Sequence, residues 1–106
     1  MVVGFQEKPQ ERIPVEIEVR SLKELTHLMQ SSLVPDRILL DNFPVRELKK
    51  AVSFVKRCAK HPLLEASGGV HLANVRAVAK TGVDRISIGR LTHSAPAIDF
   101  SLDVTL

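Results

Sequence analysis

Short apolar runs recur along this chain at almost equal intervals, and this regularity constrains the fold more than any other feature. The runs begin near Val15, Ile38, Leu63 and Ile86, at intervals of 23, 25 and 23 residues. Segments with helical periodicity lie between them. Parallel strands joined by right-handed helical crossovers have this spacing. The sequence therefore predicts a βαβαβαβ chain with a parallel strand order.

The residues within each run support this interpretation. In the first run Val15, Ile17 and Val19 alternate with polar residues, which is the period of a strand. The runs ILL and LLE are typical of strands covered on both faces. The expected strands occupy residues 13–20, 36–41, 62–66 and 85–88.

Helix signals separate the strands. Ser21 and Glu24 form a capping box, Pro44 suits the first turn of the second helix, and Gly82 is expected at C′ of the third. The apolar positions at helical spacing are Leu22, Leu25, Leu28 and Met29, then Leu48, Ala51, Val52, Val55 and Ala59, then Leu72, Val75, Val78 and Ala79.

The two ends of the chain are less regular. Residues 1–12 are polar and include Pro9, so we expect a poorly ordered lead-in before a single domain at 13–106. A short helical turn is expected after Pro96, and the segment 98–104 closes the chain.

Two architectures give this pattern: an open, doubly wound sheet and a (β/α)₈ barrel. Four strands are half a barrel, and a complete barrel takes about 250 residues. The 106 residues therefore form a small open sheet, a half-barrel that needs a partner, or a piece of a larger protein.

Composition excludes several classes. The net charge is +3, the basic residues are scattered along the sequence, and Trp and Tyr are absent, so nucleic acid is not the expected partner. No run reaches the about 20 apolar residues of a membrane span. Cys58 is the single cysteine, which excludes an internal disulfide and favours a reducing, cytoplasmic location. No His/Cys spacing indicates zinc.

Polar residues collect where the strands end, which is where ligands bind in both architectures. Glu16 and Glu18 lie within the first strand, and Asp41 ends the second. One interpretation is structural: the glutamates face solvent on an edge strand and Asp41 caps a helix. The other is a carboxylate pair, Glu18 and Asp41, that holds Mg²⁺, binds ribose hydroxyls or stabilises a cationic transition state.

The third strand ends in Glu65-Ala66-Ser67-Gly68-Gly69. The glycines make either a tight turn or a phosphate loop, because glycines before a helix leave N–H groups free and let an anion approach. No Walker A sequence is present. The fourth strand is followed by Gly89, which offers similar backbone, and then by His93 in the next loop.

The segments EIEV, LLDNF, EASGGV and TGVDRISIGRLTHSAPAIDFSLD, in this order, resemble the C-terminal half of quinolinate phosphoribosyltransferases over residues 14–104. The resemblance implies a partial TIM-like α/β barrel that follows an N-terminal open-sandwich domain. It also implies synthesis of nicotinate mononucleotide, CO₂ and pyrophosphate from quinolinate and phosphoribosyl pyrophosphate with Mg²⁺, by dimers or larger oligomers.

The resemblance also implies roles for individual residues. Glu18 and Asp41 would contact the ribosyl pyrophosphate and its metal, and His93 would lie beside the phosphate cradle. Arg90 departs from the small or apolar residue expected there and would add charge. The implied phosphate cradle comprises Ser67, Gly68, Gly69, Gly89, Arg90 and Leu91.

The resemblance does not cover the part of the family that grips the two carboxylates of quinolinate, so we expect the ribose-phosphate half of a site here. Association with the missing N-terminal half, or self-association of exposed sheet edges, is expected. Two alternatives stay open. One is a non-catalytic remnant or phosphate-binding half-barrel, and the other is a sibling phosphoribosyltransferase with a different acceptor.

Overall fold

A computed structural model describes residues 2–5, 13–92 and 95–104, and side chains within 13–88 and 103–104. The described residues form one sheet whose neighbouring strands follow the chain order, with the middle four parallel and the outer two antiparallel to their neighbours. The strands are β1 (Val2–Phe5), β2 (Val15–Val19), β3 (Arg37–Asp41), β4 (Leu63–Ser67), β5 (Arg85–Thr92) and β6 (Ala95–Asp103). The predicted set of four parallel strands, β2–β5, is confirmed.

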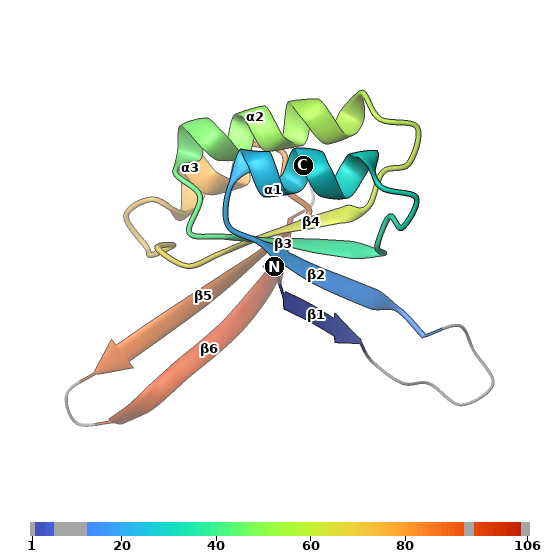
Figure 1. The fold of residues 1–106 in the computed structure, drawn as a ribbon. Coiled ribbons are helices and arrows are strands. Elements are labelled where there is room, and N and C mark those ends of the chain that lie inside the picture. The colour runs from blue at the N-terminus through green and yellow to red at the C-terminus, as the bar shows by residue number, and fades with distance from the viewer. Residues whose placement is uncertain (1, 6–12, 93–94, 105–106) are drawn as a thin grey trace.

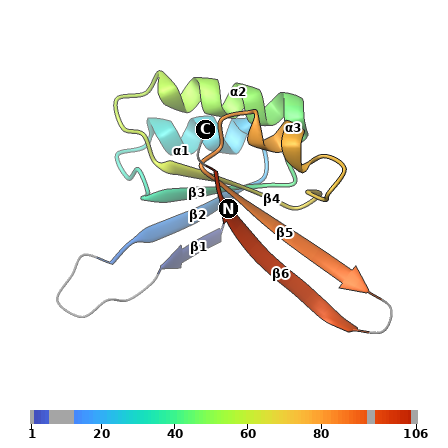
Figure 2. The same cartoon turned by 180° about the vertical axis from the view of Figure 1, so that it is seen from behind.

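Three helices connect these parallel strands: α1 (Leu22–Gln30), α2 (Val45–Lys56) and α3 (Val75–Ala79). All three cover the same face of the sheet, and the outer strands bend away from them (Figure 1). The view from behind shows the same curvature (Figure 2). Helices on one face, with strands in chain order, are the arrangement of a barrel, since a doubly wound sheet carries helices on both faces. The chain is therefore an α/β arc of a TIM-like barrel.

The core lies between the helices and the convex face of the sheet. Alternate strand residues such as Ile17, Ile38 and Ile86 point toward the helices and are buried. Leu25 and Leu48 meet them from α1 and α2, with relative exposures of 0% and 1%. Each such side chain contributes about 1.5–3 kcal/mol by leaving water. No described helix is long and apolar enough to cross a bilayer.

The opposite, concave face of the sheet carries the other half of the strand residues, and we call it the open face. No described helix covers it (Figure 1). Because side chains alternate along a strand, the residues that share it follow from the register. They are Glu16 and Glu18 on β2, Arg37, Leu39 and Asp41 on β3, Leu63, Glu65 and Ser67 on β4, and Arg85 and Ser87 on β5.

The capping box of α1 is confirmed in part. The backbone N–H of Glu24 donates to Ser21 Oγ at 3.1 Å, but the Glu24 carboxylate accepts from the N–H of Arg20, at 2.7 Å, one residue before the N-cap. This backbone hydrogen bond lowers the pKa of Glu24 below its ordinary value.

The second helix keeps its predicted apolar face, since Leu48, Ala51, Val52 and Val55 are all buried. Ala59 was expected on that face and is not part of it. The helix ends at Lys56, and Ala59 is exposed in the following loop.

The third helix is shorter than predicted. Leu72 was expected on its buried face but is 78% exposed and precedes the helix. The N–H of His71 donates to Asn74 Oδ1 at 2.8 Å, and Asn74 Nδ2 donates to the carbonyl of Gly69 at 2.9 Å. Such local bonds compete with helical ones and delay the helix to Val75. At its other end the C-cap is Lys80, so Gly82 lies one residue beyond the expected C′.

Three predictions for the chain ends were incomplete or wrong. Residues 2–5 form β1, although the whole segment 1–12 was expected to be a lead-in. The strand expected to end at Ile88 continues to Thr92. The helical turn expected after Pro96 is part of β6, which lies at the edge of the sheet, where proline is tolerated.

Candidate functional site

The carboxyl ends of β2, β3 and β4 bring three predicted site residues to one end of the open face. Asp41 and Ser67 are direct partners in the parallel register. Glu18 is opposite Leu39, two residues before Asp41, so the two carboxylates are diagonal neighbours on adjacent strands. The predicted residues Glu18, Asp41 and Ser67 therefore share one surface.

The turn after β3 and the loop after β4 fit closely against each other. The N–H of Asn42 donates to the carbonyl of Ser67 at 2.6 Å. A Cβ placed on Gly68 would lie 3.0 Å from Asp41 Oδ1 and 3.2 Å from the Asn42 nitrogen, and one on Gly69 would lie 3.1 Å from Asn42 Oδ1. Gly68 thus has no room for a side chain against the Asn42 backbone, whereas at Gly69 only the exposed Asn42 side chain would have to shift.

Backbone conformation favours glycine at both positions. Gly68 and Gly69 have φ values of +78° and +70°, and Asn42 has φ +59°. This left-handed region is open to glycine and tolerated by asparagine. Within the described part of the chain, no backbone hydrogen bond uses the N–H of Gly68 or Gly69. Consecutive free N–H groups in such a turn form a concave anion site.

The predicted helix N-terminus next to these glycines is not there. The five-residue α3 begins at Val75, after the turn held by His71 and Asn74. Any anion site in this loop therefore depends on its own N–H groups, with no contribution from a helix dipole.

Asp41 is held from two sides. Its Oδ2 lies 3.6 Å from Arg20 Nε, and its Oδ1 faces the backbone of Gly68. The Asp41 side chain is 30% exposed, so its carboxylate is open to a ligand. The structural alternative, that Asp41 caps a helix, is wrong, because the N-cap of α2 is Pro44.

Glu18 is half-buried in β2, with β1 on one side and β3 on the other. The alternative that Glu16 and Glu18 belong to an edge strand is therefore also wrong. Among the described residues, no group of three or more His, Cys, Asp or Glu side chains could hold a metal. Glu18 and Asp41 alone fit Mg²⁺ only in the form in which it keeps waters and is shared with substrate phosphates.

For the remaining predicted site residues, the structure describes only the backbone or nothing at all. Gly89, Arg90 and Leu91 were expected in a loop but belong to β5, where Gly89 pairs with Asp99 and Arg90 with Ile98 of β6. His93 lies outside the described residues.

A second polar cluster on the open face was not predicted. Glu65 is 7% exposed, and its Oε2 accepts a hydrogen bond of 2.6 Å from Ser87 Oγ. Its Oε1 lies 3.5 Å from Arg85 Nε and 4.0 Å from Arg37 Nη1. The sequence signal was a glutamate inside the apolar run LLEAS, flanked in space by the first residues of two neighbouring strands.

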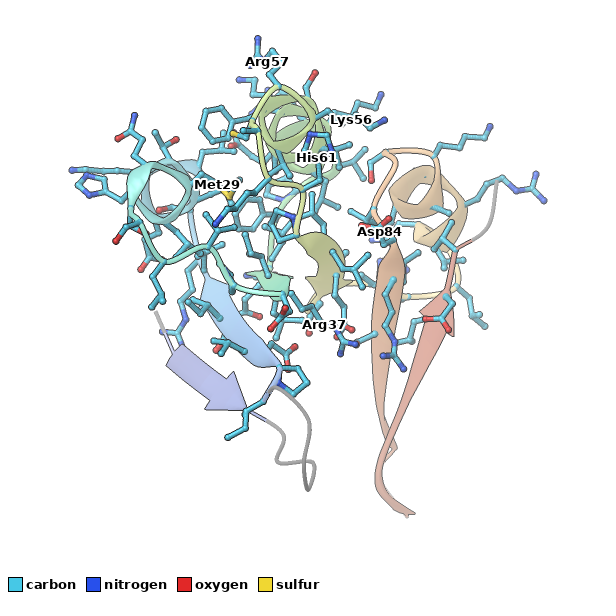
Figure 3. The ribbon with its side chains drawn as sticks, turned by 90° about the vertical axis from the view of Figure 1, so that its right-hand side faces the viewer. Met29, Arg37, Lys56, Arg57, His61 and Asp84 are labelled. Atoms are coloured by element: carbon cyan, nitrogen blue, oxygen red, sulfur yellow. The ribbon has the colours of Figure 1, made fainter. Side chains whose placement is uncertain are left out.

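This cluster borders a cavity of about 370 Å³ at the amino ends of β3, β4 and β5. Arg37 projects from the sheet on the side away from the helices (Figure 3). Leu63, Asp84 and Asp103 also line the cavity, and Asp103 pairs with Arg85 at 3.4 Å. The cavity is thus at the opposite end of the strands from Asp41 and Gly68.

Comparisons with known proteins point to one family. Carboxylating nicotinate-nucleotide pyrophosphorylase from Mycobacterium leprae is 44% identical over 92 residues, which are 87% of this chain and 32% of that protein. The protein of that name from Rattus norvegicus is 41% identical over 90 residues, 85% of this chain and 29% of that protein. The chain thus spans about a third of the length of these relatives.

Solved structures agree. The nicotinate-nucleotide pyrophosphorylase of Ehrlichia chaffeensis superimposes with a TM-score of 0.61 at 36% identity, over 74% of this chain and 27% of that one. The enzyme from Francisella tularensis gives 0.57 at 37% identity, over 67% and 24%. Residues 1–103 match the family model of the quinolinate phosphoribosyl transferase C-terminal domain. The chain therefore belongs to the quinolinate phosphoribosyl transferase family, as part of its C-terminal domain.

Proposed function

We propose that this chain supplies the ribose-phosphate half of a carboxylating nicotinate-nucleotide pyrophosphorylase site. That enzyme would form nicotinate mononucleotide, CO₂ and pyrophosphate from quinolinate and phosphoribosyl pyrophosphate. The observation that carries the proposal is the close fit of the Asp41–Asn42 turn against Gly68 and Gly69. This fit supports the proposal because a carboxylate lies next to the backbone N–H groups that we propose as the phosphate cradle, at the carboxyl ends of adjacent strands.

The loop after β4 would hold the phosphate of the ribosyl substrate. The N–H groups of Gly68 and Gly69 donate to its oxygens, and the absence of a Cβ lets the phosphate come close. The Ser67 hydroxyl, on the open face beside Asp41, is a further donor. We keep Gly89, Arg90, Leu91 and His93 as additional proposed phosphate contacts.

The carboxylates would act on the ribose. When pyrophosphate leaves, positive charge develops on the ribose ring, and Glu18 and Asp41 stabilise it from fixed positions on rigid strands. Arg20, bound to one oxygen of Asp41, keeps that carboxylate oriented. When bound, Mg²⁺ would neutralise charge on the pyrophosphate and be held by Glu18 or Asp41 together with the substrate oxygens.

Binding of the acceptor, quinolinate, needs cations for its two carboxylates, and the described residues at this end of the sheet do not supply enough of them. Arg37 and Arg85 on the open face lie within 4.0 Å and 3.5 Å of Glu65 and are at the amino ends of their strands. We propose that cations gripping the two carboxylates of quinolinate come from the rest of the relatives' length, on a chain that packs against the open face. Self-association into a homo-oligomer is the other form of association that we propose. We also propose a cytoplasmic location.

An activity assay tests the whole proposal. This chain is mixed with a separately produced upstream half of a relative, and pyrophosphate release from quinolinate and phosphoribosyl pyrophosphate is measured with Mg²⁺. We expect turnover only in the mixture, and Glu18→Gln should lower it by about 10²-fold or more. Turnover that is unchanged by Glu18→Gln would contradict the assigned role. If the mixture forms a stable complex on size exclusion but shows no turnover, the chain is not the ribose-phosphate half of this enzyme.

A further inference from the structure

The solvent face of α2 is almost entirely cationic. Five residues of this helix are exposed, and four of them are Arg or Lys while the fifth is Ser53. The same stripe continues past the helix end, where Arg57 projects away from the sheet (Figure 3). Lys56 is exposed at the edge of the stripe, and its ammonium lies near Gly82. We call the exposed residues Arg46, Lys49, Lys50, Lys56, Arg57 and Lys60 the cationic ridge.

Nothing described neutralises the ridge. The ion pairs within the described part of the chain involve Arg20, Arg37 and Arg85, and none involves a ridge residue. The one acid on α2, Glu47, is half-buried beside the ridge. The described carboxylates at strand positions lie on the other side of the sheet: Glu16, Glu18, Asp41, Glu65 and Asp103. Although the net charge of the chain is only +3, the ridge is positive and most of the strand carboxylates lie on the open face.

Helix stability does not account for the pattern. Arg46 and Lys50 are four residues apart, a spacing at which like charges repel. Arg46 also lies in the first turn, where the helix dipole disfavours a cation. The dipole favours only Lys56 and Arg57, at the other end. Arg46 therefore weakens the helix, whereas Lys50 gains from Glu47 three residues before it.

We propose that the cationic ridge binds the phosphate backbone of nucleic acid without reading its sequence. Over the 12 residues of α2 it extends about 18 Å, and a duplex presents one negative charge per about 1.7 Å of its axis. Phosphate contacts alone supply this kind of binding. The ridge has no aromatic side chain for stacking and no amide or carboxylate to read adenine or cytosine, and its Arg and Lys side chains contact phosphates as well as guanine.

Other anionic partners fit the ridge less well. A protein interface needs apolar anchors at its centre, and every exposed residue of α2 is polar. A membrane-surface helix inserts its apolar face, whereas Leu48, Val52 and Val55 of α2 are buried in the core. The expectation of no nucleic-acid partner rested on basic residues scattered along the sequence, but six of the 15 lie within residues 46–60 and are exposed on and just after α2.

Fluorescence anisotropy of the intact chain with a labelled DNA duplex of mixed sequence tests the proposal. We expect the logarithm of the association constant to fall linearly with the logarithm of salt concentration, by about 0.9 per phosphate contact. The double variant Lys49→Gln/Lys50→Gln should lower the affinity and reduce this slope by about two. Both side chains are exposed, and glutamine forms helices about as well as lysine, so the variant should fold.

The matched control removes the same charge elsewhere. Arg76 on α3 and Lys80, its C-cap, are both exposed, and Arg76→Gln/Lys80→Gln should leave the slope unchanged. Equal loss in the two double variants would show that net charge alone is responsible and would overturn the proposal. It would also be overturned if poly-L-glutamate competed as well as unlabelled duplex, because the ridge would then be a general docking surface for acidic chains.

Discussion

The two ends of the parallel sheet are built in opposite ways. At the amino ends, charged side chains complete the structure: Asp36 Oδ2 accepts from the N–H of Val15 at 2.7 Å, and Asp84 Oδ2 accepts from the N–H of Leu64 at 2.8 Å. After the carboxyl ends of β3 and β4, the backbone is left-handed at Asn42, Gly68 and Gly69, and among the described residues no backbone hydrogen bond uses the N–H groups of the two glycines. In barrels the first end usually serves stability and the second serves chemistry.

A repeated tripeptide shows how the stable end is made. Asp-Arg-Ile occurs at 36–38 and again at 84–86, at the starts of β3 and β5. In both copies the aspartate binds the preceding parallel strand and the arginine faces Glu65 on β4 between them. The isoleucine enters the core. The repeat thus ties alternate strands to their neighbours through aspartate side chains, whereas at the carboxyl ends the link between β3 and β4 is a backbone hydrogen bond, from the N–H of Asn42 to the carbonyl of Ser67.

The largest difference between the two ends should appear in a pair of glycine variants. Gly68→Ala places a Cβ 3.0 Å from Asp41 Oδ1 at φ +78°. We expect the affinity for phosphoribosyl pyrophosphate with Mg²⁺, measured by titration calorimetry, to fall about 10–100-fold, the equivalent of about 1–3 kcal/mol.

Gly82→Ala is the control, because it introduces a similar conflict, at φ +97° and 3.1 Å from Val52 Cγ1, on the helix side of the sheet. It should lower the melting temperature and leave the affinity of the folded protein unchanged. If Gly82→Ala weakened binding as much as Gly68→Ala, the carboxyl-end loop would have no special role.

Asp84→Ala should show the reverse behaviour. It removes the acceptor of the Leu64 N–H, so we expect the free energy of unfolding in urea to fall by about 1–3 kcal/mol. Ligand affinity should not change. Asp84→Asn keeps an acceptor oxygen at the same place and should recover most of the stability. A loss of stability as large in the asparagine variant as in the alanine variant would rule out this hydrogen bond as the cause.

The N–H of Asn42 joins the turn after β3 to the loop after β4. Because Asn42 has φ +59°, alanine and glycine variants distinguish backbone strain from loss of the side chain. Asn42→Ala should lower the free energy of unfolding by about 1 kcal/mol, because alanine is strained in the left-handed region. Asn42→Gly should lower it by less, because glycine adopts this conformation without strain. Thermal unfolding of the two variants measures the difference. Equal stability in both would mean that this backbone relaxes and that Asn42 does not fix the loop.

The smallest predicted effect concerns pH. The N–H of Arg20 lowers the pKa of Glu24 in the folded chain below its value in the unfolded chain. The stabilisation is therefore complete above the unfolded pKa and is lost as the pH falls through the lower, folded pKa. Glu24→Gln should flatten the pH dependence of the melting temperature in this acidic range. A profile identical to that of the parent would show that the hydrogen bond does not contribute.

Much of this fold follows from periodicity. The apolar positions of α2 up to Val55, the capping serine of α1 and the parallel order of β2–β5 were all predicted correctly, because each depends on local spacing. The errors at Leu72 and Pro96 have physical causes. Side-chain bonds of His71 and Asn74 replace the first helical turn, and an edge strand accepts proline.

The candidate site could be predicted less completely. That Asp41 and Ser67 share an end of the sheet follows from the parallel topology. The close approach of Gly68 to Asp41, the left-handed Asn42 and the ion pair with Arg20 depend on the three-dimensional path of two loops, which no sequence spacing encodes. The cationic face of α2 was within reach of the sequence, since all six ridge cations lie within residues 46–60 opposite the predicted apolar face, but the basic residues were judged over the whole chain.

The most direct test of the division between the two ends is an NMR titration of the ¹⁵N-labelled chain with phosphoribosyl pyrophosphate and Mg²⁺. We predict that the largest amide shifts occur at Asn42, Gly68 and Gly69, while Val15 and Leu64, bound at the amino ends, shift little. Shifts concentrated at Val15 and Leu64, with none at the two glycines, would contradict the assignment of the ribose-phosphate site to the carboxyl ends.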